Sequence, residues 1–243
     1  MSFLIRQTLI YAIPLMIVAL AGVFAERSGV INLALEGIMI FGAFVGALTI
    51  NLMQKANTFQ IIDVAKDMTA NWGKLQLFLL LIMAITAVAG AVFSLLLAFA
   101  AINLKADQTI GGTALNMLSP ALVCFFLRLI AQQSELRMFK GDAASWFMVK
   151  KTMLGFDKAQ DIGFLGETFL NKVYLTTYLC IILFVLLSIF LYKTRFGLRL
   201  RACGENPQAA ASLGINVYKM RYSGVIISGA LAGMGGFVYT LTT

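Results

Sequence analysis

The sequence contains no histidine and few charged residues. Of its 243 residues, 12% are Asp, Glu, Lys or Arg, about half the usual share. Because a soluble domain needs a polar surface, this composition argues against an ordinary globular enzyme. The absence of histidine excludes Ser–His–Asp and Cys–His catalysis and every His-ligated metal site. We therefore predict no catalytic residue and no metal site in this chain.

Cysteine and proline are also scarce. The three cysteines, Cys124, Cys180 and Cys203, are scattered and form no C-x-x-C pair, so neither a disulfide framework nor a zinc site is indicated. Three prolines and so few charges also exclude collagen and intrinsic disorder.

Hydrophobic residues make up 60% of the chain, and they are concentrated in long runs. Each run is close to the roughly 20 residues that a helix needs to cross a bilayer. This pattern predicts an all-α, polytopic integral membrane protein with about six to eight transmembrane helices, whose residues 1–243 form one transmembrane domain. The six runs span 8–25, 28–50, 75–103, 108–127, 173–192 and 222–243.

The charges gather in the connections between these runs. Connection 193–222 carries six basic residues and one acidic residue, a net charge of +5. Basic residues accumulate in cytoplasmic connections, so we predict that 193–222 is cytoplasmic and that 131–172, where the charges are mixed, is external. Because the basic cluster lies so close to the bilayer, it indicates contact with membrane lipids rather than with nucleic acid.

A short helix is expected inside the cytoplasmic connection, over residues 205–215. Asn206 can cap its start, Pro207 suits the first helical position, and Gly214 can end it in a left-handed conformation. Ala-rich helices of this length are marginal in water, so either the scaffold or a partner protein must hold it.

Three motifs together resemble one family, the permease subunits of bacterial ABC importers for branched-chain amino acids, ribose and nucleosides. Within that family the motifs look most similar to nucleoside permeases, with simple-sugar permeases next. The resemblance runs along nearly the whole chain. The motifs are ERSGVINLALEG at 26–37, ADQTIGGTALN at 106–116, and TRFGLRLR at 194–201 continuing through GENP to residue 215.

The resemblance implies a type II-like importer permease in the bacterial cytoplasmic membrane that moves a nucleoside or a related small polar solute. It implies that 205–215 is the coupling helix, which docks on a separate ATP-binding subunit. The chain has no G-x-x-x-x-G-K-[ST] motif, so ATP and Mg are expected on that subunit and no cofactor on this chain. A second permease subunit, identical or homologous, and an extracellular substrate-binding (lipo)protein are the other implied partners. The coupling residues are Gly204, Glu205, Asn206, Pro207, Ala210, Leu213 and Gly214.

Polar residues inside the apolar runs are candidates for the substrate path. Charged and amide side chains at membrane depth usually face a pore or another helix. The spacing of Thr109, Thr113 and Asn116 places them on one helix face, and Pro120 is expected to bend or break that helix. The alternative explanation is hydrogen bonding between helices. The full candidate set is Asn32, Glu36, Gln108, Thr109, Thr113 and Asn116.

Topology and length leave two questions open. Six single crossings place the N-terminus outside, whereas the family pattern places it inside, so one or two broken or re-entrant helices are expected near 27–37 or around Pro120. Relatives continue for several more membrane helices, so we also expect the chain to be either C-terminally truncated or a shortened member.

Other functions remain possible from the sequence. One is an ion-coupled secondary transporter or channel that uses Glu36 and Asp107, and another is a membrane anchor or assembly factor without a transport path. A sugar or branched-chain amino acid permease is the alternative within the family. The paired small residues at Gly42 and Gly46 and at Gly229 and Gly233 indicate close helix packing.

Overall fold

The fold is a bundle of long helices, shown by a computed structural model that describes residues 2–55, 72–132, 148–149 and 173–242. Six of the described helices are long and apolar enough to cross a membrane, which confirms the six predicted runs. Connection 131–172 lies almost entirely outside the described residues. The long helices are α1 (Ser2–Arg27), α2 (Leu35–Lys55), α4 (Trp72–Ala98), α5 (Gln108–Phe126), α7 (Leu175–Lys193) and α10 (Val217–Thr242).

Shorter elements complete the described chain. The π-helical turns η2 (Phe99–Asn103) and η3 (Leu127–Ala131) end α4 and α5. The strands β1 (Met148–Val149) and β2 (Val173–Tyr174) form an antiparallel pair. Helices α8 (Arg195–Glu205) and α9 (Pro207–Ser212) connect α7 to α10.

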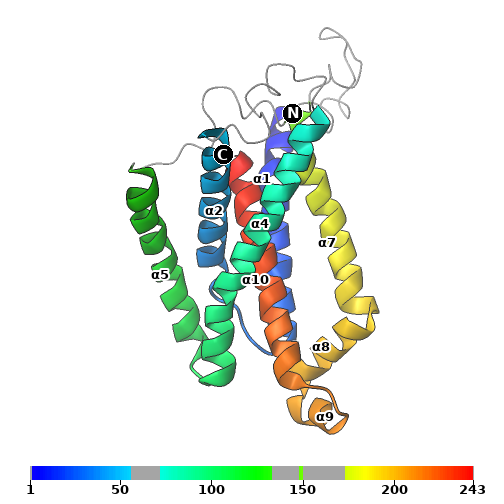
Figure 1. Cartoon of the computed structure of the whole chain (residues 1–243). Coiled ribbons are helices and arrows are strands. Elements are labelled where there is room, and N and C mark those ends of the chain that lie inside the picture. Colours follow the sequence, from blue (N-terminus) through cyan, green and yellow to red (C-terminus); the bar gives the residue numbers. More distant parts are fainter. Residues whose placement is uncertain (1, 56–71, 133–147, 150–172, 243) are drawn as a thin grey trace.

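The six long helices alternate in direction (Figure 1). The N-terminus lies at the opposite end of the bundle from α8 and α9, so the topology matches six single crossings, and no additional crossing occurs among the described residues. Pro120 lies inside α5 without ending it, so the expected break at that position is wrong. The helical structure is instead interrupted at 28–34, between α1 and α2.

Helix α10 is the central element, and it packs against α1, α2 and α4. Glycines allow this close approach. A β-carbon at Gly42 would lie 2.5 Å from the carbonyl oxygen of Gly233, and one at Gly233 would lie 2.5 Å from the carbonyl oxygen of Thr86. The ring of Phe237 fills the space that Gly46 leaves free. The prediction that these glycines serve helix packing is therefore confirmed.

The close packing of α10 against α2 and α4 provides the first test. We expect Gly233→Ala to destabilise the protein, because overpacking costs about 1–3 kcal/mol and exceeds the ~1 kcal/mol that Ala gains over Gly in a helix. Thermal unfolding of the purified protein in detergent measures the change. The matched control is Gly73→Ala, where a β-carbon meets nothing within 4 Å. Equal or higher thermal stability of Gly233→Ala would contradict this close packing.

Candidate functional site

The segment 28–34 is not helical. Its first three N–H groups form turn hydrogen bonds to the end of α1, from Ser28 and Val30 to the Ala25 carbonyl and from Gly29 to the Glu26 carbonyl, at 2.9–3.3 Å. It begins with Ser28, whose hydroxyl donates to the carbonyl of Ala25 at 2.6 Å, and with Gly29 at φ +86°. Membrane-spanning structures tolerate such backbone only where protein groups or water satisfy its polar atoms. The partners of these backbone atoms therefore show which predicted substrate-path side chains bind the backbone and which remain available for a solute.

Helix α5 supplies partners for the second half of the segment and for the beginning of α2. The carbonyl oxygen of the Gln108 side chain accepts the Ile31 N–H at 2.8 Å. The Asn116 side chain donates to the Leu33 carbonyl and accepts the Gly37 N–H, both at 2.8 Å. These bonds align segment 31–37 with roughly 12 Å of α5, at a rise of about 1.5 Å per residue.

Two buried serines complete the arrangement. The Ser119 hydroxyl donates to the Gly37 carbonyl at 2.6 Å, one turn beyond Asn116. The Asn32 side chain donates to the Ser228 hydroxyl of α10 at 2.9 Å and accepts the Ala34 N–H at 3.1 Å. Sequence reasoning did not select these serines, although Ser119 lies three positions after Asn116 on the same helix face.

The structure therefore divides the predicted substrate-path residues into two groups. Asn32, Gln108 and Asn116 come together around segment 28–37, and their amide groups hydrogen-bond to it or to α10. Glu36 and Thr109 are exposed, and Thr113 donates to carbonyls of its own helix. The first group thus positions backbone, whereas exposure leaves the second group accessible to a solute.

Asp107 caps the start of α5. Its carboxylate accepts the N–H groups of Thr109 at 2.7 Å and Ile110 at 3.4 Å. The hydrogen bond from the Thr109 N–H is the main reason that the pKa of Asp107 lies below its usual value. This capping accounts for Asp107 without any role in ion coupling.

The short helix predicted within connection 193–222 exists, but it is shorter than expected. Helix α9 covers Pro207–Ser212, whereas Glu205 belongs to the end of α8. The boundary arises because Asn206 is extended and its side chain accepts the Ala209 N–H at 3.0 Å. Gly214 ends the element at φ +80°, so the predicted cap and terminator are confirmed.

The predicted coupling residues occupy different environments. Gly204 lies inside the last turn of α8, and Ala210 is the buried residue of α9. Leu213 follows α9 and is 80% exposed. Its side chain is therefore accessible to a partner protein.

The end of α8 packs directly against the beginning of segment 28–37. A β-carbon at Gly204 would lie 2.5 Å from the carbonyl oxygen of Arg27 and 3.1 Å from the nitrogen of Gly29. Arg27 and Glu205 also form an ion pair at 3.6 Å. Both side chains are largely exposed, so the backbone contact matters more for stability than this pair does.

The sequence matches the model of a known family over residues 4–243, that of the permease component of branched-chain amino acid transport systems. The chain belongs to this family. The permease is accordingly a multi-pass protein of the cytoplasmic membrane. No solved structure matches the chain significantly.

Curated relatives narrow the comparison. The permease is 44% identical to the guanosine ABC transporter permease protein of Bacillus subtilis (strain 168), over 100% of this chain and 68% of that protein. It is 37% identical to the nucleoside ABC transporter permease protein of Lactococcus lactis subsp. cremoris, over 98% of this chain and 67% of that protein. It is 28% identical to a putative glucose ABC transporter permease protein of Haloferax volcanii, over 97% of this chain and 63% of that protein. The permease thus spans about two thirds of the length of these relatives.

Replacing Asn116 tests whether its amide positions segment 28–37. We expect Asn116→Leu to lower the free energy of unfolding by roughly 2–4 kcal/mol, because both the Gly37 N–H and the Leu33 carbonyl lose their partner. Amide hydrogen exchange at Gly37 should accelerate as well. Thermal unfolding and exchange mass spectrometry measure the two effects.

Thr113→Val is the control, because among the described residues the Thr113 hydroxyl bonds only to carbonyls of its own helix. It should change the stability by about 0.5 kcal/mol or less. If Asn116→Leu were as stable as Thr113→Val, with unchanged exchange at Gly37, the positioning role of Asn116 would be wrong.

Proposed function

We propose that this permease is the membrane-spanning subunit of an ABC importer that carries nucleosides into the cell. The observation that supports this most strongly is the full-length similarity to relatives named for guanosine and nucleoside transport. The chain itself carries out no bond chemistry under this proposal. A separate ATP-binding subunit binds ATP and Mg and hydrolyses the nucleotide.

Neutral polar groups suit such a solute. A nucleoside has hydroxyls and ring nitrogens but no fixed charge, so hydroxyl and amide partners can bind it without a compensating ion. Thr109 and Thr113 lie exposed on α5, and Glu36 lies exposed at the start of α2. We assign the hydroxyls of Thr109 and Thr113 to the path, together with the Glu36 carboxylate as a hydrogen-bond acceptor for solute hydroxyls. Asn32, Gln108 and Asn116 hold the backbone beside the path.

The ATP-binding subunit would dock on α9 and on Leu213. Movement of α9 reaches α8 through Asn206, since this residue ends α8 and caps α9. Gly204 of α8 contacts Arg27 and Gly29, from which segment 28–37 continues to Asn116. A continuous series of short contacts therefore links the docking site to the proposed path.

Two further partners follow from the proposal. A second permease subunit would complete the translocation pathway, and an extracellular substrate-binding protein would deliver the solute. Connection 131–172, the candidate surface for that delivery, lies almost entirely outside the described residues.

Uptake by a reconstituted importer tests the function. We expect proteoliposomes that contain the permease, its ATP-binding subunit and its binding protein to import labelled guanosine only with ATP. Unlabelled nucleosides should compete, whereas ribose and leucine should not. Competition by ribose or leucine alone would assign the importer to another solute class.

An uncoupler separates the ATP-driven mechanism from an ion-coupled one. An uncoupler at constant ATP should leave uptake unchanged, whereas a collapse of uptake would favour an ion-coupled transporter.

A charge at position 213 tests the proposed docking site. Leu213→Asp should reduce binding of the ATP-binding subunit, because the new carboxylate replaces an exposed apolar contact. Asn216→Asp is the matched control, since it adds the same charge nearby and keeps an oxygen that can accept the Lys219 N–H. Equal binding of the two variants would argue against docking at Leu213.

A further inference from the structure

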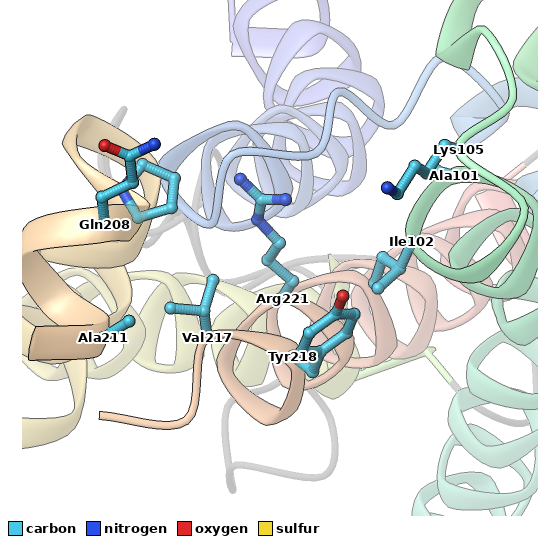
Figure 2. Close-up of a pocket in the computed structure, with 9 residues that line it drawn as sticks. Ala101, Ile102, Lys105, Gln208, Ala211, Val217, Tyr218 and Arg221 are labelled. Carbon is cyan, nitrogen blue, oxygen red and sulfur yellow. The ribbon is translucent and has the colours of Figure 1, made fainter. Parts of the chain in front are cut away.

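The end of the bundle that carries α8 and α9, predicted to be cytoplasmic, contains a cavity of about 390 Å³ beside α9. This volume lies within the range of roughly 300–1,000 Å³ that is typical of small-molecule sites. Three separate parts of the chain line it, namely α9, the first turns of α10, and η2 with the loop that follows (Figure 2). None of the residues assigned to the substrate path contributes to it.

Two cationic side chains face this cavity. In Figure 2 the guanidinium of Arg221 and the ammonium of Lys105 point toward the same space, Arg221 from α10 and Lys105 from the loop after η2. Lys105 has φ +52°, a conformation that few non-glycine residues adopt and that often marks functional sites. Within the described residues, no carboxylate lies within 4 Å of either cation.

The side chain of Arg221 is positioned by packing, but one of its hydrogen-bond donors has no partner among the described residues. Its guanidinium packs on Gly29, where a β-carbon would lie 3.4 Å from one terminal nitrogen. Its Nε atom is buried and has no hydrogen-bond partner among the described residues. Two like charges directed at one space repel each other, and an anion between them converts that repulsion into attraction.

We propose that the cavity binds a phosphate group, either of an anionic phospholipid headgroup or of a soluble phosphate compound. The planar guanidinium of Arg221 matches two phosphate oxygens, and Lys105 adds a point charge. Tyr218 offers a hydroxyl donor at the cavity wall, and Ile102, Val217 and Ala211 form an apolar wall for the remainder of the ligand. Cytoplasmic leaflets concentrate anionic headgroups at their surface, beside which the predicted cytoplasmic connection 193–222 would lie.

Occupancy would connect α9 to the bundle. The cavity is bounded by α9 on one side and by η2 on the other, so one phosphate would bridge the short helix and the end of α4. Binding itself does not depend on the proposed transport function, so the two hypotheses can fail separately.

Ligand-induced thermal stabilisation of the purified chain in neutral detergent tests the proposal. One titration uses phosphatidylglycerol with phosphatidylcholine as the neutral reference, and another uses inorganic phosphate at constant ionic strength. We expect one of these anions to raise the unfolding temperature saturably. The Lys105→Gln/Arg221→Gln double variant should require a higher concentration for half-maximal stabilisation, about five-fold for each charge removed.

Arg199→Gln/Lys219→Gln is the matched control, because both residues are exposed at the same end of the bundle outside the cavity. It should retain the wild-type concentration dependence. Ala211→Phe, which fills the cavity while keeping both cations, should weaken binding as the first double variant does.

The outcome also identifies the source of the phosphate. A cavity-dependent response to phosphatidylglycerol alone assigns a lipid headgroup, and a cavity-dependent response to inorganic phosphate assigns a soluble ligand. Equal weakening by both double variants would show general attraction to a basic surface and would overturn the proposal. Absence of saturable stabilisation by either anion would overturn it as well.

Discussion

A non-helical stretch inside an apolar bundle must have its backbone polar groups paired, and this requirement organises the structure. Each unpaired N–H or C=O in the membrane costs several kcal/mol. Segment 28–37 meets the requirement first with turn hydrogen bonds to the end of α1, and further along with the side chains of Gln108, Asn116 and Ser119 of α5. The register of α2 against α5 is set by these bonds, because a shift by one residue would break them.

The same segment connects α8, next to the proposed docking site of the ATP-binding subunit, with the helix that carries the proposed substrate path. Its beginning lies against Gly204 of α8, and its end is held by Asn116. Close packing around Gly233 brings α10 near α2 and α4, and Ser228 of α10 bonds to Asn32. Short backbone distances and buried hydrogen bonds make this region stiff, so a displacement at α8 would be passed on rather than absorbed.

The sequence was sufficient to predict the long helices, because apolar length follows directly from the bilayer as solvent. It left the orientation of the N-terminus open, because the count of crossings and the family pattern disagreed. It also predicted the cap at Asn206 and the end at Gly214, since both depend on local chemistry. It could not decide whether Asn32, Gln108 and Asn116 serve a solute or the backbone, because that depends on which carbonyls the fold brings within reach. Of the two effects expected at Pro120, a break does not occur, because α5 continues past the proline to Phe126. The cavity at Lys105 and Arg221 joins residues more than 100 positions apart, and no local pattern marks it.

The central claim is that the contact between Gly204 and the beginning of segment 28–37 couples ATP hydrolysis to transport. The most direct measurement is the number of nucleoside molecules imported per ATP hydrolysed by the reconstituted importer with Gly204→Ala, compared with Gly73→Ala. A β-carbon at Gly204 separates α8 from Arg27, so we expect hydrolysis to continue while the ratio falls well below that of the control. An unchanged ratio in a stable Gly204→Ala complex would contradict the claim.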